Sequence, residues 1–376
     1  MTIYDVIIIG GGVAGLSAAL TLKTPNNNIL LLEKQHYPRH KVCGEYISNE
    51  VLPLLDYFEI DVFEKGAVAI SRMGISLKSG KAIQNVDLPL GGFGISRYSL
   101  DLAMYEKAVA KGVHFEFDTV TAVSFENNLF SVNSGTKTFT SKLVIGAQGK
   151  RSNLDKHFNR DFITQKTEWI GIKAHYTAKN YDPSLVSLHH FEGGYAGLSM
   201  VEGNKVNCCY LCSTNNFTAS GSIANFQEKV AAQNPYLDSF FKSAEMVFDK
   251  PISIAQISFA PKDLVYNKIL FCGDAAGLIH PLCGNGIAMG LHGGYLLGNL
   301  CLYYLNGSID SQEALANTYT QLWKKTFSKR LQEGRRLQNL LLNKNINSVL
   351  LESFKTFPTL LQKVIKRTHG KPIFIT

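Results

Sequence analysis

The 376-residue chain lacks several features that would assign it to a class at once. It has no run of about 18 consecutive apolar residues, so we expect no membrane-spanning helix. Its start carries an acidic side chain and no basic signal-peptide region, and we therefore expect a cytoplasmic protein. The seven cysteines are odd in number and spread along the chain, which favours a reducing compartment over a disulfide scaffold. We find no internal repeat and no low-complexity segment.

Positive charge is unevenly distributed along the chain. The formal net charge is +8, but residues 321–376 alone carry twelve Lys and Arg against two acids. The remainder has 26 basic and 28 acidic residues, so the main body is close to neutral. No nucleic-acid-binding motif accompanies the basic segment, and we exclude nucleic acid as a partner. Leucines interleave with these cations, which fits either packing on the body or peripheral contact with the inner face of the membrane.

The order of hydrophobic patterns predicts two intertwined lobes. Residues 3–33 read as strand, glycine turn, helix and strand, which implies a parallel sheet with a right-handed crossover. Residues 166–213 alternate like antiparallel strands, and residues 268–277 return to a buried strand and a glycine turn. We interpret residues 75–94 as irregular and glycine-rich. Residues 99–112 read as a helix with Ser99 as its N-cap and Gly112 as its stop signal.

A glycine-rich hexapeptide, Gly10–Gly15, lies between the first strand and the first helix and matches G-x-G-x-x-G. Gly10 permits the tight turn, Gly12 lets backbone approach a pyrophosphate, and Gly15 lets helix and strand pack closely. The helix start attracts phosphate, and Glu33 at the end of the next strand can accept hydrogen bonds from a ribose. The candidate dinucleotide contacts in this unit are Gly10, Gly12, Val13, Ala14, Gly15, Glu33 and Lys34.

A second signature, Lys268–Gly294, decides between nicotinamide and flavin. An aspartate after a buried strand, followed by glycines that open a helix, resembles the ribityl-binding segment of FAD oxidoreductases of the p-hydroxybenzoate hydroxylase superfamily. The resemblance implies FAD, with Asp274 on a ribityl hydroxyl. It also implies that the turn Cys283–Gly286 brings Gly284, Gly286 and Ile287 to the flavin pyrimidine edge, where the positive helix end stabilises reduced flavin.

Three further stretches resemble the same family. Ser96–Asp101 matches its R-x-x-L-D segment and implies that Arg97 lies beside the flavin chain. Residues 119–123 resemble the strand that meets the adenine, which nominates Val120. Gln148 stands where the family usually has an aspartate, and this departure weakens any transfer of NADPH specificity.

The sequence PRHKVCGEYIS, which we call the 38–48 loop, resembles the place where the geranylgeranyl reductase branch carries Cys-Gly-Gly near the isoalloxazine. This chain has Cys43-Gly44-Glu45 instead. On the resemblance Arg39 and Lys41 meet the pyrophosphate and Gly44 lets backbone approach the ring. Cys43 either steers substrate or donates a proton, or it is a small apolar filler.

The antiparallel segment is expected to roof the substrate pocket. Alternation places Trp169, Lys173 and His175 on one face of their strand, and Tyr195 falls where related enzymes line the pocket. His175 is either a packed histidine or a catalyst. Alternation places Cys209 and Cys212 on opposite faces of their strand, and no second pair occurs at zinc spacing, so we expect no metal site.

These patterns and the resemblance together predict an α/β fold with a Rossmann-like FAD-binding lobe of the glutathione-reductase type. An antiparallel-sheet substrate lobe is inserted in it, and a helical region follows. The predicted boundaries are 1–75, 95–165 and 260–305 for the FAD-binding lobe, 76–94 and 166–259 for the substrate lobe, and 306–376 for the basic helical region.

The predicted function is that of an FAD-dependent oxidoreductase, most like the geranylgeranyl reductase branch. It would take electrons from NAD(P)H or another reduced carrier and reduce carbon–carbon double bonds of an apolar, isoprenoid or polyene-like substrate. Two alternatives stay open at this stage. One is a monooxygenase acting on an aromatic or polyketide substrate, and the other is a prenyl-binding escort protein without redox activity.

Overall fold

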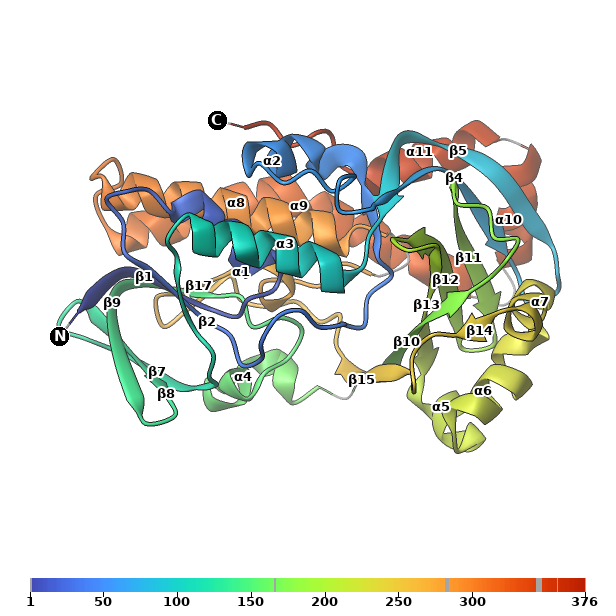
Figure 1. Cartoon of the computed structure of the whole chain (residues 1–376), viewed down its shortest axis with the longest axis horizontal. Coiled ribbons are helices and arrows are strands. Elements are labelled where there is room, and N and C mark those ends of the chain that lie inside the picture. Colours follow the sequence, from blue (N-terminus) through green and yellow to red (C-terminus); the bar gives the residue numbers. More distant parts are fainter. Residues whose placement is uncertain (1, 166, 281–283, 343–346, 357, 376) are drawn as a thin grey trace.

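The computed structural model describes residues 2–165, 167–280, 284–342, 347–356 and 358–375. Two sheets lie side by side along the long axis, and a layer of long helices covers the first (Figure 1). The predicted α/β class is confirmed.

The first sheet is mainly parallel and joins segments from distant parts of the chain. Its strand order is β16-β17-β9-β1-β2-β6, with β7 and β8 paired beside β9. The strands are β1 (Ile3–Ile9), β2 (Ile29–Leu32), β6 (His114–Glu116), β7 (Val120–Glu126), β8 (Leu129–Ser134), β9 (Lys137–Gly146), β16 (Val265–Tyr266) and β17 (Ile269–Phe271). Because β17 pairs with β9, the second glycine turn is brought to the same sheet edge as the first.

Long helices pack on this sheet through small residues. They are α1 (Val13–Leu22), α3 (Arg97–Ala110), α8 (Gly286–Leu305) and α9 (Gln312–Leu342). A Cβ at Gly294 of α8 would lie 2.2 Å from the carbonyl oxygen of Ala14. The Ser17 hydroxyl also donates to the Leu291 carbonyl at 2.7 Å. The glycines of α8 therefore set how closely it lies against α1.

Helix α3 begins earlier than predicted. The Ser96 hydroxyl, not that of Ser99, caps it by accepting from the Ser99 backbone N–H at 3.1 Å. Both serines stand near the start of the helix, and the prediction placed the N-cap three residues too late. The predicted stop is confirmed, since Gly112 follows the C-cap residue Lys111 with φ +85°.

The second sheet has the order β14-β10-β13-β12-β11-β4-β5-β3, with β15 beside β10. Its strands are β3 (Tyr46–Ser48), β4 (Val68–Ser76), β5 (Ala82–Gly94), β10 (Trp169–Thr177), β11 (Leu185–Phe191), β12 (Gly194–Val201), β13 (Lys205–Ser213), β14 (Glu245–Met246) and β15 (Ile252–Ile257). Strands β3 and β4 thus belong to this sheet, although β3 and all but the last residue of β4 lie within residues 1–75. The domain boundaries themselves stay a prediction.

The interpretation of residues 75–94 as irregular was wrong, because β5 is a thirteen-residue strand. Its glycines lie where neighbouring groups come too close to the backbone for a side chain to fit. A Cβ at Gly94 would lie 1.8 Å from the Met200 carbonyl oxygen, and one at Gly92 would lie 2.4 Å from the Tyr46 ring. Glycine in a strand can therefore mark tight packing as well as a turn.

Helices α5 to α7 cover one face of the second sheet, and the C-terminal helices cover part of the other, while the remaining short elements lie at the first lobe. The short elements are η1 (Asn49–Val51), α2 (Leu52–Tyr57), α4 (Asn153–His157), η2 (Asp161–Ile163), α5 (Thr214–Ser220), α6 (Ile223–Lys229), η3 (Ala231–Gln233), α7 (Pro235–Ser243) and η4 (Gly273–Ala275). The C-terminal helices are α10 (Asn347–Thr356) and α11 (Pro358–Thr368). Leu351, Phe354 and Ile365 from these helices pack with apolar residues of β4 and β5.

The end of the chain returns to the first lobe, near α2 (Figure 1). The Ile373 N–H donates to the Glu50 carbonyl at 2.8 Å, and the Asn285 side chain donates to the Thr368 carbonyl at 2.9 Å. Among the described helices, none combines the length and the apolar character that a bilayer span requires.

Candidate functional site

The first glycine turn has the geometry of a dinucleotide-binding turn. Gly10 has φ +107°, and a Cβ there would lie 2.4 Å from the carbonyl oxygen of Ala147. A Cβ at Gly15 would lie 2.0 Å from the carbonyl oxygen of Gly10, so any larger residue would push α1 off the turn. Gly12 is the N-cap residue of α1, which leaves the helix N–H groups, including those of Val13 and Ala14, at this end of the helix.

Two cations face the same turn. A Cβ at Gly12 would have the Arg97 Nη2 atom at 3.7 Å and the Lys41 Nζ atom at 3.9 Å. Asp101 holds both, since Arg97 donates to it with two nitrogens at 2.7 and 2.8 Å and Lys41 donates at 2.8 Å. Burial alone would lower the pKa of Arg97, but the Asp101 carboxylate raises it above its usual value. Burial lowers the pKa of Lys41, and the Asp101 carboxylate opposes that shift. Both cations are therefore positioned for a pyrophosphate, and Arg97 carries the firmly held charge.

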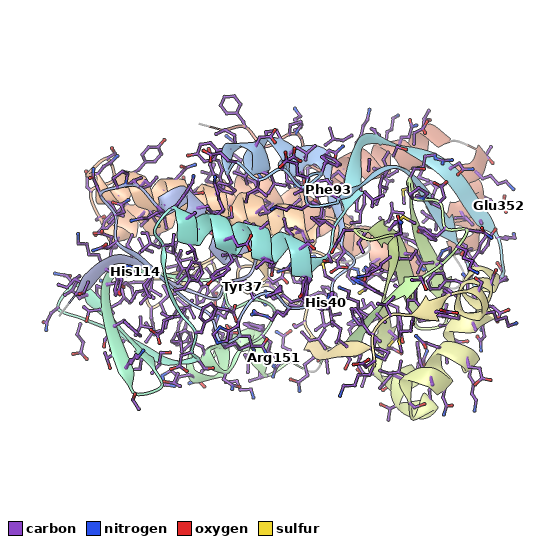
Figure 2. The ribbon with its side chains drawn as sticks, in the orientation of Figure 1. Tyr37, His40, Phe93, His114, Arg151 and Glu352 are labelled. Carbon is purple, nitrogen blue, oxygen red and sulfur yellow. The ribbon has the colours of Figure 1, made fainter. Side chains whose placement is uncertain are left out.

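The acidic residue of the predicted ribose site lies beside the glycine turn and holds Arg39. Glu33 accepts from the Gly11 N–H at 2.8 Å and pairs with Arg39 at 2.8 Å. Arg39 thus lies at the Glu33 carboxylate, and its contact with the pyrophosphate stays a prediction. Lys34 is exposed next to Glu33. Tyr37, which we did not predict, donates to the Gly11 carbonyl at 2.5 Å and fixes the 38–48 loop to the turn (Figure 2).

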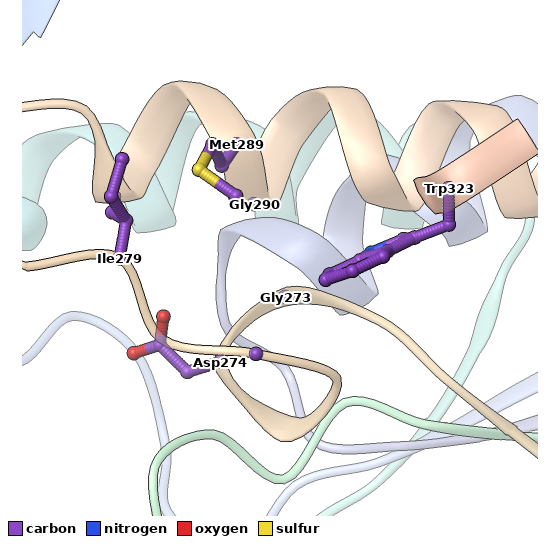
Figure 3. A pocket seen from close by; sticks show the side chains of 8 residues that line it. Gly273, Asp274, Ile279, Met289, Gly290 and Trp323 are labelled. Carbon is purple, nitrogen blue, oxygen red and sulfur yellow. The ribbon is translucent and has the colours of Figure 1, made fainter. Parts of the chain in front are cut away.

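The second signature forms a short turn, η4, beneath the start of α8. Figure 3 shows the Asp274 side chain at this turn, with Met289 and Gly290 of α8 opposite. The two elements enclose a narrow cavity of about 10 Å³. The Asp274 carboxylate makes no hydrogen bond to a described residue, so its acceptor capacity is available to hydroxyl groups.

Two cations that the sequence did not reveal, the buried Arg160 and the partly buried Lys262, hold this turn. Arg160 donates to the carbonyls of Asp263 and Ala275, at 2.7 and 3.1 Å, and lies over the Phe271 ring. Lys262 donates to the Asp274 carbonyl at 2.7 Å, and burial lowers its pKa to about 8. Basic residues on a loop carry no recognisable pattern, so only the fold reveals them.

At position 148, where the family usually has an aspartate, this chain has a glutamine that is hydrogen-bonded to a nearby aspartate. Gln148 donates to Asp155 at 3.1 Å, and Asp155 forms a fully buried ion pair with Arg160 at 2.9 Å. The carboxylate is thus supplied seven residues further along the chain. It serves the Arg160 network rather than a solvent-facing site.

The predicted flavin-edge turn and adenine strand lie in the same lobe. Gly284 has φ +63°, Gly286 begins α8, and Ile287 is buried against the core. Cys283 of this turn lies outside the described residues. Val120 begins β7 and is also buried in the core of the first lobe.

The backbone of Cys43 and Gly44 is gripped by the second sheet. Asn207 donates to the carbonyls of Cys43 and Gly44 at 3.1 and 2.8 Å, and the Ser199 hydroxyl donates to the Gly44 carbonyl at 3.1 Å. Around a Cβ built at Gly44 no atom lies within 4 Å. The backbone therefore has its carbonyl side fixed and its other side open, which is the arrangement that a flat ring needs for close approach. Cys43 itself is partly buried and is not in a disulfide.

Glu45 is the residue that the sequence analysis missed. It has φ +55° and is fully buried, and it accepts from the Arg97 backbone N–H at 2.7 Å. Lys173 forms an ion pair with one carboxylate oxygen, and the His175 Nε2 atom lies 2.7 Å from the other. Burial alone would raise the pKa of Glu45, but Lys173 and His175 lower it below its usual value.

His40 completes this cluster at the junction of the lobes (Figure 2). Its ring lies 5.0 Å from that of His175 and 4.5 Å from that of Phe248. One ligand-type atom from each of His40, Glu45 and His175 lies within 4.8 Å of the others. A cation placed among them would meet the Lys173 ammonium on the same carboxylate, so we interpret the cluster as an ion-pair network rather than a metal centre.

The predicted strand faces are confirmed. Ile172, Ala174 and Tyr176 belong to the core under α5–α7, whereas Lys173 and His175 point to the 38–48 loop. On β13, Cys212 lies in the helix-covered core with Cys208. Cys209 points to the opposite side, so no C-x-x-C pair forms.

An aromatic group surrounds a histidine near the second glycine turn. The His280 ring lies 4.2 Å from that of Phe259, 6.4 Å from Trp169 and 6.3 Å from Tyr195. His280 is 3% exposed, and neither ring nitrogen has a hydrogen-bond partner within the described structure. Burial lowers its pKa to about 3. A buried neutral imidazole without hydrogen-bond partners destabilises the folded protein unless a bound molecule supplies a partner.

These features fit FAD. The turn and its two cations suit a pyrophosphate, Glu33 suits a ribose, Asp274 suits a ribityl chain, and Gly44 leaves room for a ring. Each lies on a different segment of the first lobe or on the 38–48 loop.

Comparison with known proteins agrees with this geometry. Residues 3–332 match a family described as FAD binding domain. The digeranylgeranylglycerophospholipid reductase of Methanosarcina acetivorans is 24% identical, with 97% of this chain and 93% of the relative covered. The FAD-dependent monooxygenase atnA of Arthrinium is also 24% identical, over 97% of this chain and 52% of the relative.

Two solved structures have the same fold. The flavin-dependent brominase Bmp2 superposes with a TM-score of 0.80 at 18% identity, covering 97% of this chain and 92% of its own. A geranylgeranyl bacteriochlorophyll reductase-like protein from Thermoplasma acidophilum gives 0.76 at 18% identity, covering 98% and 97%. With the family match spanning most of its length, the chain belongs to the FAD-binding domain family of p-hydroxybenzoate hydroxylase-like flavoproteins and is an FAD-dependent oxidoreductase.

Proposed function

We propose that this oxidoreductase reduces carbon–carbon double bonds of an apolar, isoprenoid or polyene-like substrate. Its electrons would come from NAD(P)H or another reduced carrier. The observation that carries the proposal is the 38–48 loop, whose Cys43-Gly44 backbone is fixed on one side by Asn207 and Ser199 and open on the other. A relative named digeranylgeranylglycerophospholipid reductase matches along almost the whole chain, which supports the substrate class.

Reduction of an alkene requires a hydride on one carbon and a proton on the other, and bound reduced FAD supplies the hydride. This chain's residues would supply the rest. Cys43 would deliver the proton from its thiol, or would hold the alkene against the ring. The aromatic side chains of Trp169, Tyr195 and Phe259 would bury the apolar substrate and exclude water.

A flavin monooxygenase is the second candidate function. The relative atnA is named a monooxygenase, and the fold serves both chemistries. His280 favours this candidate to the extent that a substrate hydroxyl or carbonyl meets its free nitrogens, since an all-hydrocarbon chain would leave them unsatisfied.

The two candidates separate in an anaerobic assay. Purified protein with its flavin reduced by dithionite is mixed with a geranylgeranyl lipid, and the products are analysed by mass spectrometry before and after oxygen is admitted. A gain of two hydrogens without oxygen supports the reductase. A product that gains an oxygen atom, and only after oxygen enters, overturns it in favour of the monooxygenase. Protein that purifies without FAD and does not take it up would support a redox-inactive escort.

A further inference from the structure

A pocket of about 450 Å³ lies away from the aromatic group, between β5, α9 and α11. Five exposed cations stand around it: Lys325 and Lys329 from α9, Lys366 and Arg367 from α11, and Lys371 beyond α11. No acidic residue is among the described residues that line it. Its volume falls within the range of small-molecule sites.

Within the described part of the chain, no acidic side chain neutralises these five cations. None of them forms an ion pair with any residue in the described part of the chain. Arg330, at the same pocket, shows the contrast. It pairs with the buried Glu50 at 3.3 Å, and a Cβ at Gly370 would lie 2.0 Å from its Nη2 atom. Arg330 is thus a structural cation, whereas the five around it leave a concave surface of one sign, which concentrates anions.

The floor of the pocket is apolar. Leu88, Pro89 and Leu90 of β5, Ile365 of α11 and the ring of Tyr46 contribute to it. Thr326 and His369 also line the pocket, but these five residues present mainly hydrocarbon, which a site for a small hydrated anion would not need. The combination matches a molecule with a charged head and an apolar body.

We propose that this pocket binds the phosphate-bearing headgroup and the adjoining acyl or prenyl carbons of a lipid. The cations would hold the phosphate ester, and the apolar floor would cover the first carbons of the chain. Phosphate oxygens accept hydrogen bonds from lysine and arginine at once, which suits five cations that line one pocket from two helices and the segment after α11. The site does not rest on the proposed reaction, because it requires neither flavin nor turnover.

Isothermal titration calorimetry on the FAD-loaded protein tests the proposal. The probe is monomeric dihexanoylphosphatidylglycerol, and inorganic phosphate and dihexanoylphosphatidylcholine are titrated in parallel. We expect saturable binding of the phosphatidylglycerol at one site, at least about tenfold tighter than either comparison compound. Equal affinity for inorganic phosphate would overturn the lipid assignment, and no saturable binding of the lipid would overturn the site.

Two charge-matched double variants separate the pocket from a diffuse basic surface. Lys366→Glu with Lys371→Glu reverses two pocket charges, and Lys324→Glu with Lys355→Glu reverses two exposed charges of the same region outside the pocket. The first pair should weaken phosphatidylglycerol binding at least about tenfold and the second less than twofold. Equal losses, or binding to phosphatidylglycerol vesicles without binding of the monomeric lipid, would show a diffuse surface and contradict the proposal.

The apolar floor is tested separately. Leu90→Gln keeps every cation and places an amide on the floor. Affinity for the dihexanoyl lipid should fall severalfold while weak binding of inorganic phosphate stays the same. A variant that changes neither would contradict the contribution of the floor. Circular dichroism and thermal unfolding of each variant confirm that it is folded.

Discussion

Glu45 connects the two lobes through a single buried carboxylate. Glu45 belongs to the 38–48 loop, and its partners come from the start of α3, through the Arg97 N–H, and from β10, through Lys173 and His175. Isolated buried charges are costly, so each member of such a network depends on the others. The network therefore fixes the position of Cys43 and Gly44, the neighbours of Glu45, relative to the substrate sheet.

Removal of the Glu45 charge should destabilise the protein strongly. In Glu45→Gln the fully buried Lys173 ammonium loses its counter-charge, and we expect a loss of about 3–5 kcal/mol in the free energy of unfolding, measured by urea denaturation. Adding Lys173→Met should restore part of it. The matched control is Glu192→Gln in the exposed pair with Lys78, which should cost less than about 1 kcal/mol. A small effect at Glu45 would mean that the cluster is solvated.

Cys43 is tested by its closest replacement. Cys43→Ser keeps the size and the backbone that Asn207 holds, so FAD content and absorbance should not change. Turnover on the true substrate should fall at least tenfold, because a hydroxyl is a far weaker acid than a thiol. Steady-state rates across pH are the measurement. Turnover equal to that of the natural protein would make Cys43 a packing residue.

Replacement of His280 should preserve or increase the stability of the protein and lower its activity. Its buried nitrogens have no partner among the described residues, so His280→Leu removes an unsatisfied polar group and should leave the melting temperature unchanged or raise it. The rate with substrate should fall if a polar group of the substrate meets the ring. A variant that loses stability would show that the ring is a structural member of the aromatic group.

Sequence patterns identify the turn residues of the site but not the network around Glu45. Gly10, Gly12 and Asp274 act through local backbone geometry, and their spacing predicts it. Glu45 is visible only as a departure from Cys-Gly-Gly, because Lys173 and His175 lie 128 and 130 residues away in the sequence. No local pattern encodes a contact over that separation.

At the scale of elements, α1 and α8 behave as one unit. Both begin at a glycine turn of the cofactor site, and their small residues hold them in contact. A shift of one helix therefore changes the position of both turns.

Neighbouring glycines in α8 provide a matched test of this contact. Gly294→Ala places a Cβ 2.2 Å from the Ala14 carbonyl oxygen, so we expect a loss of more than about 2 kcal/mol and weaker FAD retention. Gly293→Ala meets its nearest atom at 3.8 Å and should be neutral or stabilising by up to about 1 kcal/mol. Denaturation curves and flavin fluorescence report both quantities. Similar values for the two variants would contradict the packing argument.

The elements themselves were predictable where pattern and packing agree. The strand–turn–helix at residues 3–22 and the strands of residues 169–213 carry clear periodicity, and both are confirmed. Strand β5 was missed because three of its last four residues are glycines, which local rules associate with turns. Its neighbours, Met200 and Tyr46, explain the glycines, and they are known only once the sheet is assembled.

At the scale of the whole molecule, buried histidines should make stability depend on pH. Burial lowers the pKa of His189 and of His190 to about 4 each, from an unfolded value near 6.5. The unfolded chain then binds more protons than the folded one between these values, so stability is full above about pH 6.5 and falls as the pH drops towards 4.

The slope of that loss can be measured with one substitution. Each such histidine contributes up to about 1.4 kcal/mol per pH unit within the window. His190→Phe removes one titrating ring from the buried sheet and should make the free energy of unfolding less dependent on pH between 6.5 and 4.5. His114→Gln at the surface is the control substitution. An unchanged slope in His190→Phe would show that other groups cause the acid sensitivity.

The pairing of β17 with β9 has a consequence for how this protein is made. A ribosome that has translated the first two thirds of the chain has released β1, β9 and the first glycine turn, but β17, η4 and α8 are still to come. The nascent chain at that stage presents one unpaired sheet edge and only the first of the two glycine turns of the cofactor site. Such a state is prone to association with other chains. Loading of the flavin must therefore wait for late synthesis, and a supply of chaperone or of free FAD at that moment should govern the yield of active protein in the cell.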